Sequence, residues 1–441
     1  MSFYNSYPGF LYRQFLVCPP KAPSGTSLQG KAGIVTGSNT GLGYQASAQL
    51  LRHGLTHLIL AVRNLSKGEI ARASLLASLP KSTKPPVIEV WELDLADYSS
   101  ITRLANRLQK SGINIDFALL NAGVANFNYT QTPSTSHESS IQINWLGTAL
   151  LTLLLLFDLN KQAVVNPTRP RPVISIVGSE TAAWAKFKEA QVSTAKGIPL
   201  IEVLDDKSHF DMGDRYYTSK LLYQLFFLEL VRSHRPVSQG AILNIVNPGL
   251  CYGSDLHRTA EGAFGGILSG MKRVVGRSLS MGARTLVHAA VLAGESSDGG
   301  YLSDCKMAPF AGYGDGDYGR KVQTQVWKET VAELSRVVDM DKLLLPELYG
   351  VVGPSNARFM LPVSGTNCCL SSMSLLTDLC ALPALDSMDN RYDVVESTCS
   401  GTMLRIATML KNSLMFSPKF VLFNVRRHRT SARSIMPEPN G

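Results

Sequence analysis

Short apolar runs alternate with longer amphipathic segments over roughly the first three quarters of the chain. Buried strands are predicted for the apolar runs at residues 32–36, 58–62, 87–93, 117–120, 173–177 and 241–246. Helices are predicted between them, at residues 41–53, 66–79, 99–110, 138–159 and 214–233. This alternation is typical of a parallel sheet that is covered by helices on both faces. We therefore predict an α/β fold.

The alternation fades after about residue 345. Residues 346–441 keep only two short amphipathic patterns, at 371–382 and 402–414. We interpret this part as an irregular C-terminal extension. Residues 1–29, rich in Tyr, Phe and Pro, are predicted to be an N-terminal arm. The main folded domain is accordingly expected to span residues 30–345.

The composition fits a soluble globular protein, because 45% of the 441 residues are hydrophobic and 17% are charged. The seven cysteines are odd in number and lack metal-ligand spacing, so we expect reduced thiols, no metal site and a cytoplasmic location. No charged segment followed by an apolar run marks a signal peptide near the N-terminus. The apolar run 145–157 is too short to span a bilayer and is predicted to be a core helix.

The formal net charge of +9 suits a protein that binds a polyanionic cofactor. No nucleic-acid-binding motif accompanies this charge, so we expect no nucleic-acid partner. The basic run 426–429 leaves contact with a membrane surface as an alternative, but a solvated chain end is the favoured interpretation. The oligomeric state stays open, with a homo-oligomer among the alternatives.

A glycine-rich turn links the first predicted strand to the first predicted helix. It contains Gly37, Asn39, Gly41, Leu42 and Gly43. Glycine permits a tight turn and lets backbone N–H groups approach a phosphate, and the helix N-terminus adds partial positive charge. The turn is therefore a candidate site for the pyrophosphate of a dinucleotide. The alternative is a strand–helix turn without a ligand.

Three further cofactor positions follow the next predicted strands. Arg63 comes after the second strand, where an acid would favour NAD and an arginine can pair with the 2′-phosphate of NADP(H). Asp94 ends the third strand, where it can hold the adenine edge. The small residues of Asn121-Ala122-Gly123 end the fourth strand and let the chain pass the cofactor. The alternative interpretation of Arg63 is an ordinary surface arginine.

The candidate chemistry rests on Tyr216 and Lys220, which lie four residues apart and share one helix face. An ammonium near a phenol stabilises the phenolate and is expected to bring the pKa of Tyr216 from about 10 toward neutrality. Tyr217 is one step out of this register. Ser179 follows the fifth strand and can donate to a substrate carbonyl. Asn144 lies in an apolar helix, so its amide needs a partner such as a backbone carbonyl or an ordered water.

Over about residues 28–345 the sequence resembles the short-chain dehydrogenase/reductase family. The matching pieces are 36–43, Asp94, 121–123, Asn144, Ser179, Tyr216, Lys220 and Asn247-Pro248-Gly249. The resemblance implies a Rossmann-like, doubly wound parallel sheet of about seven strands. It implies that Tyr216 is the acid/base, that Lys220 binds ribose and activates the phenol, and that Ser179 positions the carbonyl. It also implies a proton relay through Asn144 and cofactor contacts by Pro248 and Gly249.

The wording of these motifs is similar to filamentous-fungal members, many of which act in secondary metabolism. We therefore expect an NADP(H)-dependent oxidoreductase that interconverts a small-molecule carbonyl and its alcohol. The alternative is a non-catalytic NADPH-binding protein with a regulatory or scaffold role. Ser179 and Tyr216 lie further apart than in most members, and the insert 182–212, with Trp184, Phe187 and Phe210, is predicted to cover the substrate.

Overall fold

The computed structural model describes residues 2–80, 84–234, 240–254 and 272–344, together with Leu256, Gly266 and Gly270. The chain divides into two units, residues 1–356 and 357–441, and the described residues all belong to the first. The extension predicted at 346–441 lies outside the described residues. Its boundary therefore stays a prediction.

One sheet of eight strands forms the centre of the described unit, in the order β3-β2-β1-β4-β5-β6-β7-β8. Its strands are β1 Ala32–Thr36, β2 His57–Val62, β3 Val87–Glu92, β4 Phe117–Leu120, β5 Val173–Val177, β6 Ile242–Asn247, β7 Gly300–Ser303 and β8 Lys306–Ala308. All neighbouring pairs are parallel except β7 and β8. The predicted parallel sheet is confirmed, while β7 and the antiparallel edge strand β8 were not among the six strands predicted from the apolar runs.

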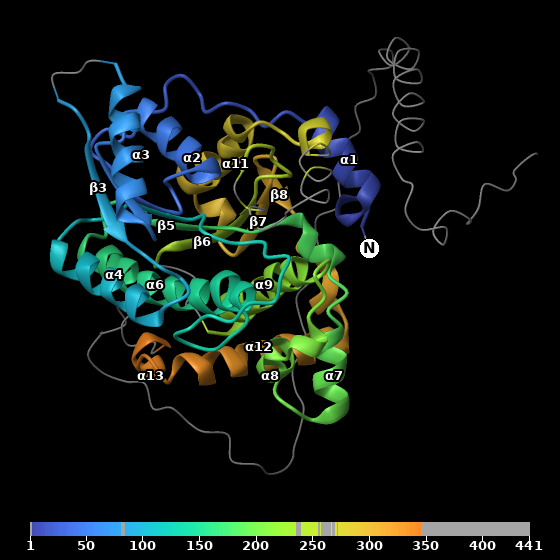
Figure 1. Cartoon of the computed structure of the whole chain (residues 1–441). Helices are drawn as coiled ribbons and strands as arrows, with labels where there is room; N and C mark the ends of the chain where they lie inside the picture. The colour runs from blue at the N-terminus through green and yellow to red at the C-terminus, as the bar shows by residue number, and fades with distance from the viewer. Residues whose placement is uncertain are drawn as a thin grey trace, which may run out of the picture. The chain divides into compact units, whose positions relative to one another are not determined.

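Helices cover both faces of this sheet, as predicted (Figure 1). On one face lie α2 Gly41–Arg52, α3 Leu65–Ala77 and α11 Leu279–Val291. On the other lie α4 Tyr98–Ser111, α6 Thr148–Val165 and α9 Arg215–Ser233. Because β1 pairs with both β2 and β4, the chain reverses its direction of travel through the sheet at β1. In such folds ligands bind in the crevice at the carboxyl ends of the strands around this point.

The most apolar helical run extends from Ser139 to Val165. It comprises α5 Ser139–Ile141, a π-helical turn at Gln142–Gly147 and α6. Its mean hydropathy of 1.6 would suit a membrane span by length and composition, yet 89% of the apolar window is buried inside the fold. The run is therefore a core helix, as the sequence predicted.

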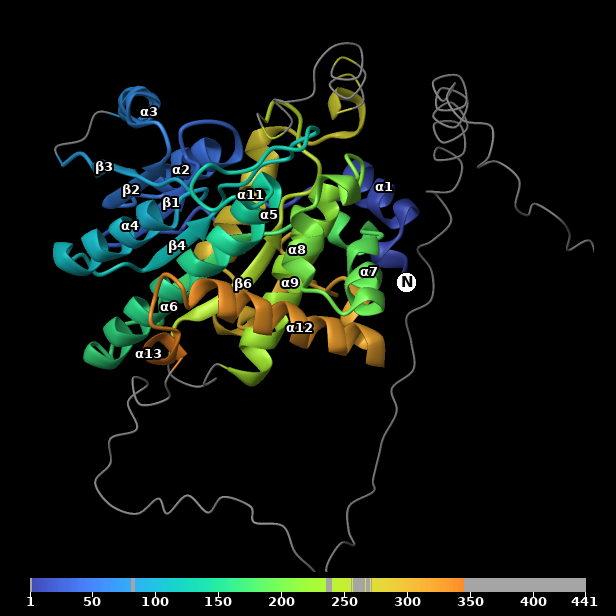
Figure 2. The ribbon, with the colours of Figure 1, turned by 60° about the horizontal axis from the view of Figure 1, so that its bottom comes forward.

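The insert between Ser179 and Tyr216 forms α7 Lys188–Lys196 and α8 Leu200–Asp205, which lie beside α12 Asp317–Leu334 (Figure 2). Glu329 of α12 accepts hydrogen bonds from the first N–H groups of α8, at 2.8 Å from Leu200 and 2.9 Å from Ile201. The aromatic ring of Phe187 is fully buried in the core. Within the insert, α8 therefore packs on α12 and Phe187 packs in the core, while the prediction that the insert covers the substrate stays a prediction. The last helix is α13 Met340–Leu344.

The predicted N-terminal arm contains a helix, α1 Tyr7–Leu16, beside the β7 and β8 end of the sheet (Figure 1). Ser6 caps this helix by accepting the N–H of Gly9, and Pro8 lies in its first turn. Both are start signals for a helix. Short 3₁₀ turns complete the fold at η1 Phe3–Asn5, η3 Glu180–Trp184, η4 Lys207–His209, η6 Glu295–Ser297 and η7 Gly312–Asp315.

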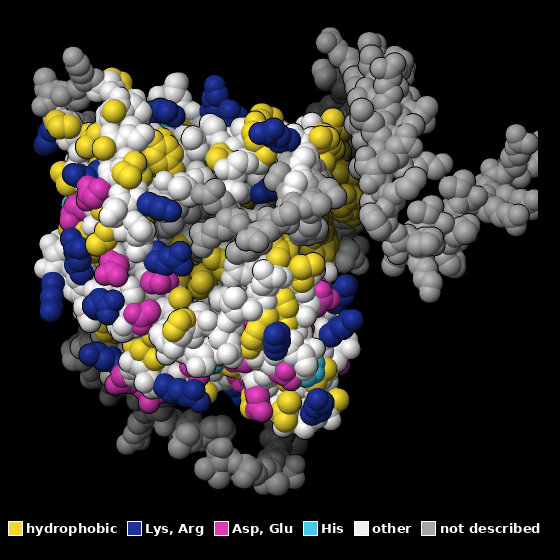
Figure 3. Space-filling view, viewed as in Figure 1, with side chains coloured by type: hydrophobic (Ala, Val, Ile, Leu, Met, Phe, Trp, Pro, Cys, Tyr) yellow, Lys and Arg dark blue, Asp and Glu magenta, His cyan; other side chains and the backbone are white. Residues whose placement is uncertain are grey.

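Basic and acidic side chains are interspersed on the face shown in Figure 3, rather than separated into two fields. The positive net charge of the chain is thus not gathered into one patch on that visible face.

Candidate active site

A cleft of about 700 Å³ opens where the carboxyl ends of the central strands meet the N-terminal helix α1. Fourteen of the predicted site residues line it: Gly37, Asn39, Gly41, Leu42, Arg63, Asp94, Asn121, Ala122, Gly123, Ser179, Tyr216, Lys220, Pro248 and Gly249. Two predicted residues, Gly43 and Asn144, do not line the cleft and lie behind its wall. The structure therefore gathers most of the predicted set around one space.

The glycine turn between β1 and α2 has the backbone that the sequence suggested. Gly37 and Gly41 have φ of +62° and +59°, which side chains rarely adopt. A Cβ on Gly43 would lie only 2.5 Å from the carbonyl oxygen of Gly37 and 2.6 Å from Nδ2 of Asn121. Gly43 thus permits α2 to pack closely against the turn and does not face the cleft. The predicted contact of Gly43 with a cofactor stays a prediction.

Asn121, just after β4, holds the glycine turn in place. Its Nδ2 donates to the carbonyl oxygens of Thr36 at 3.0 Å and Gly37 at 3.2 Å. The neighbouring Gly123 is needed for space, since a Cβ there would lie 3.0 Å from Oδ1 of Asn144 and 3.6 Å from Nζ of Lys220. These residues shape the floor of the cleft.

The opposite end of the floor is formed after β6. Gly249 has φ +73° and donates its N–H to Oδ1 of Asn247 at 3.1 Å. A Cβ on Gly249 would lie 2.6 Å from Oε1 of Gln14 in α1. The narrow turn at Pro248 and Gly249 therefore gives α1 room to approach the cleft.

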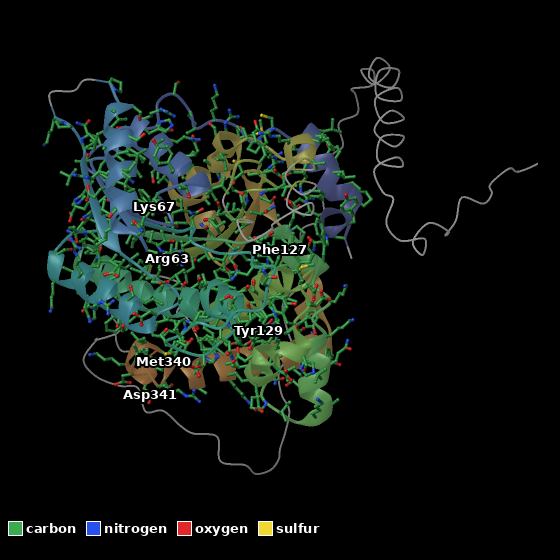
Figure 4. The ribbon with its side chains drawn as sticks, viewed as in Figure 1. Arg63, Lys67, Phe127, Tyr129, Met340 and Asp341 are labelled. Carbon is green, nitrogen blue, oxygen red and sulfur yellow. The ribbon has the colours of Figure 1, made fainter. Side chains whose placement is uncertain are left out.

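One end of the cleft carries two cations. Arg63 follows β2, and Lys67 lies in the first turn of α3, where its N–H bonds to the Asn64 cap at 2.9 Å (Figure 4). Both side chains are exposed. On the same side, Asp94 accepts the N–H of Ala96 at 3.0 Å through Oδ1. Lys67 was not predicted, although its place three residues after a capping Asn was a usable signal.

Tyr216 and Lys220 project from the first two turns of α9 into the cleft, beside the end of β5. Nζ of Lys220 donates to the carbonyl oxygen of Val177 at 2.9 Å and lies 6.0 Å from the centre of the Tyr216 ring. Burial disfavours the ammonium and lowers the pKa of Lys220 to about 8. This lysine is therefore held in place by the strand next to Ser179.

The phenol of Tyr216 keeps part of its surface in the cleft, yet the protein packed around it raises its pKa to about 12. A hydrogen bond with Ser179 acts in the opposite direction. This shift is opposite to the one expected from the nearby ammonium, because the burial of the phenol outweighs its hydrogen bond with Ser179. Ser179 itself is held by Thr181, whose Oγ1 lies 2.9 Å from its Oγ.

Asn144 connects the β4 loop to α9 from behind the cleft. Its Oδ1 accepts the N–H of Val124 at 2.9 Å, and its Nδ2 donates to the Val124 carbonyl at 2.7 Å and to Oγ of Ser219 at 2.9 Å. Ser219 in turn donates to the carbonyl oxygen of Tyr216 at 2.8 Å. The predicted backbone-carbonyl partner is thus confirmed. Asn144 lies in the π-helical turn, an irregularity that often occurs at functional sites.

The other end of the cleft is aromatic and was largely missed by the sequence analysis. Tyr7 and Phe10 of α1 line it together with Trp184 and Tyr217. The available signal was the start of a helix at Ser6 and Pro8, followed by aromatic residues at helical spacing.

The residues present fit a dinucleotide. A Cβ would fill the space at Gly37 and Gly123, α2 begins at the cleft, and two cations lie at the far end. A tyrosine, a lysine and a serine meet in the same cleft. A doubly wound sheet with such a site defines a dinucleotide-dependent oxidoreductase class.

Comparison with known proteins agrees with this class. A family profile of short chain dehydrogenases matches residues 31–166. The short-chain dehydrogenase fogG of Aspergillus ruber is 40% identical over 329 residues, which cover 73% of this chain and 90% of that protein. The short chain dehydrogenase/reductase mfmJ of Annulohypoxylon moriforme is 36% identical, over 74% of this chain and 90% of that protein.

A solved short chain dehydrogenase from Salmonella enterica serovar Typhi aligns with a TM-score of 0.45 and 17% identity, over 64% of this chain and 99% of that one. On the strength of its fungal relatives, the chain belongs to the short-chain dehydrogenase/reductase family of oxidoreductases, whose members bind a nicotinamide cofactor.

Proposed function

We propose that this protein is an NADP(H)-dependent oxidoreductase that interconverts a carbonyl compound and its alcohol. The observation that supports this most directly is the meeting of Tyr216, Lys220 and Ser179 at the end of β5, in the same cleft as the glycine turn. A bound nicotinamide cofactor would donate or accept the hydride. The protein must then supply binding, orientation and a proton.

Tyr216 is the proposed proton donor in the reductive direction. Its hydroxyl is paired with Ser179, so a carbonyl oxygen that displaces this bond would meet two hydroxyl donors. The alkoxide that develops would take the phenolic proton. With a pKa raised to about 12, Tyr216 is protonated at neutral pH, and proton transfer would depend on stabilisation of the phenolate as it forms. The Lys220 ammonium would stabilise the phenolate left behind and donate to a ribose hydroxyl.

Asn144 has a positioning role in this proposal. Its amide fixes the Val124 backbone on one side and, through Ser219, the Tyr216 backbone on the other. Loss of the amide would leave buried backbone groups unpaired. The start of α9 would then move relative to the cleft floor.

NADP(H) is preferred over NAD(H) in this proposal because of Arg63 and Lys67. Two cations at the adenosine end favour a 2′-phosphate, and the arginine fork can bind it in bidentate fashion. The same cations leave the 2′-hydroxyl of NAD(H) without the carboxylate that usually accepts from it.

We further infer a role in fungal secondary metabolism, in the cytoplasm. The support is the 30–40% identity with short-chain dehydrogenases from fungi such as Hypocrea virens and Talaromyces stipitatus. The alternative of a silent NADPH-binding regulator is disfavoured by chemistry. Such a protein has no need for a buried lysine and a serine-bound tyrosine in its cleft.

The experiment that tests the proposal begins with NADPH fluorescence on mixing, followed by turnover of a ketone and aldehyde panel. Tyr216→Phe should abolish turnover and leave NADPH affinity within about twofold, because the hydroxyl moves the proton and the cofactor is held elsewhere. Tyr217→Phe is the matched control on the adjacent residue. Turnover that survives in Tyr216→Phe, or that disappears only in Tyr217→Phe, would overturn the assignment.

A further inference from the structure

The substrate end of the cleft is walled by aromatic rings from three segments, α1, η3 and α9. The rings of Phe10 and Trp184 meet edge to face at 5.3 Å between centroids, and Tyr7 lies 6.1 Å from Trp184. Trp184 also meets Tyr217 edge to face, at 6.2 Å. We call Tyr7, Phe10, Trp184 and Tyr217 the aromatic wall. All four line the cleft.

The aromatic wall is continuous with the reacting centre. Tyr217 lies 6.3 Å from Tyr216, the proposed proton donor, with the rings at 68° to each other. A ring attached directly to a reacting carbonyl would therefore lie against this wall when the carbonyl oxygen reaches Tyr216 and Ser179. The position of the wall thus places it beside the group that the enzyme would transform.

The wall is also firmly held, so its shape is a property of the fold. The indole N–H of Trp184 donates to the carbonyl oxygen of Asn5 at 2.9 Å, and Asn5 donates to that of Phe310 at 2.9 Å. Gln14 of α1 donates to the carbonyl oxygens of Leu250 and Val275, at 2.9 and 3.1 Å. Because the Trp184 N–H is already paired, the indole offers the cleft its π surface rather than a donor.

Charge at this end is neutralised within the protein. Glu180, which lines the cleft after Ser179, is paired with the buried guanidinium of Arg13. Among the described residues that line the cleft, the other charged side chain at the reacting centre is Lys220. Its ammonium donates to the carbonyl oxygen of Val177. Among the described residues of the cleft, an anionic substrate tail would find no unpaired cation beside the wall, whereas a neutral ring gains edge-to-face contacts there.

From this arrangement we infer that the substrate is a neutral ketone or aldehyde with an aromatic ring beside the carbonyl, and that α1 completes the site that recognises it. The inference rests on the function proposed above. It assigns a specificity role to Tyr7 and Trp184, neither of which takes part in proton transfer.

The test compares matched ketone pairs, acetophenone with cyclohexyl methyl ketone and a two-ring analogue of each, with NADPH. The measured quantity is the aryl-to-cyclohexyl ratio of kcat/KM, since intrinsic reactivity cancels when this ratio is compared between variants. Trp184→Leu and Tyr7→Leu keep apolar bulk but lose the ring, and each should lower the ratio about tenfold, equivalent to 1.4 kcal/mol. Tyr12→Leu is the control, because Tyr12 is similarly exposed on α1 and does not line the cleft.

A ratio unchanged in both wall variants, or equally changed by Tyr12→Leu, would overturn the inference while leaving the proposed function intact. If the unaltered protein reduces no carbonyl compound, the function fails, and binding then tests the wall separately. In that case 2-naphthol should bind about tenfold more tightly than trans-2-decalol by calorimetry, and Trp184→Leu should remove the difference. Equal affinities of the two alcohols would overturn the inference.

Discussion

Arg13 of α1 and Glu180 of η3 form a buried ion pair across 167 residues of sequence. Both side chains are only 7% exposed, and Nε of Arg13 lies 3.5 Å from Asp304 as well. Glu180 directly follows Ser179, so this pair ties the N-terminal helix to the turn that carries a proposed active-site hydroxyl. The N-terminal segment is thus part of the catalytic unit.

Arg13→Met should lower the free energy of unfolding by about 3 kcal/mol, because it leaves two carboxylates buried with less compensation. Urea denaturation at pH 7 measures the change. Arg320→Met is the control, since Arg320 pairs with Asp317 on the exposed surface and should cost no more than about 0.5 kcal/mol. Similar losses in the two variants would contradict the importance of the Arg13 pair.

Lys220→Met should abolish turnover and yet stabilise the fold. The pKa of Lys220 is lowered by burial to about 8 from 10.5, so the folded protein binds this proton less tightly than the unfolded chain does. The resulting penalty is full below pH 8 and fades as pH rises from 8 to 10.5. The variant removes a penalty of up to about 3 kcal/mol.

Urea denaturation of Lys220→Met at pH 7 and pH 10 checks this expectation. A gain of about 1–3 kcal/mol at pH 7 that shrinks at pH 10 would agree with it, the lower value allowing for the unpaired Val177 carbonyl. NADPH affinity should fall as well, because the Lys220 ammonium is proposed to bind the ribose in addition to stabilising the Tyr216 phenolate. Unchanged NADPH binding would remove the ribose role.

Arg63→Ala should weaken NADPH at least tenfold more than NADH, because only NADPH carries the 2′-phosphate. Lys67→Ala should act in the same direction but less, since a lysine offers a point charge rather than a bidentate fork. Fluorescence titration with both cofactors gives the affinities. Arg72→Ala, an exposed arginine of α3 paired with Glu69, serves as the control and should affect neither cofactor. Equal effects of Arg63→Ala on the two would refute the proposed preference.

Protonated His137 should stabilise the fold, and this stabilisation should be lost in alkali. Its Nδ1 lies 2.6 Å from Asp205 and its Nε2 lies 3.1 Å from Glu333, which also pairs with Arg336. These carboxylates outweigh desolvation and raise the pKa of His137 from 6.5 to about 9. A raised pKa means that the contribution is full below pH 6.5 and is lost as pH rises through about 9.

The size of the His137 contribution is at most about 3 kcal/mol, from the difference between the two pKa values. Denaturation curves of the unaltered protein and His137→Gln should therefore differ most near pH 6 and converge above pH 9. His209→Gln, in an exposed pair with Asp206, should retain the original pH profile. A constant difference across this range would show that the histidine acts by packing alone.

The sheet and its helices were predictable because their signals are local. Apolar runs such as 117–120 and 173–177 are buried on both faces, and the observed strands match them residue for residue. Strands β7 and β8 were not among the predicted strands, and β8 has only three residues, largely exposed, without a periodic pattern. It is reached through Asp304 and Cys305, both at positive φ, a turn that the residue types do not announce.

Site residues that belong to sequence motifs could be predicted. Site features that depend on tertiary contacts could not. Tyr216, Lys220 and Ser179 could be brought together from strand ends and helix spacing. The ion pair of Arg13 with Glu180 depends on how α1 docks, which no local pattern encodes. The predicted lowering of the Tyr216 pKa was wrong for a similar reason, since the structure raises it. The balance between burial of the phenol and its hydrogen bond with Ser179 is decided by packing that only the folded chain reveals.

A chain that ends after Pro346 should fold and turn over substrate as the whole chain does. The described residues up to 344 already contain the complete sheet and every proposed site residue, so kcat/KM should stay within about twofold. A chain that ends after Val337 is the matched control. It removes Met340 and Leu343, which are buried at 4% and 8% exposure, and should lose about 3 kcal/mol of stability. If the longer truncated chain is insoluble or folds without activity, the tail belongs to the catalytic domain and the predicted boundary at 345 is mistaken.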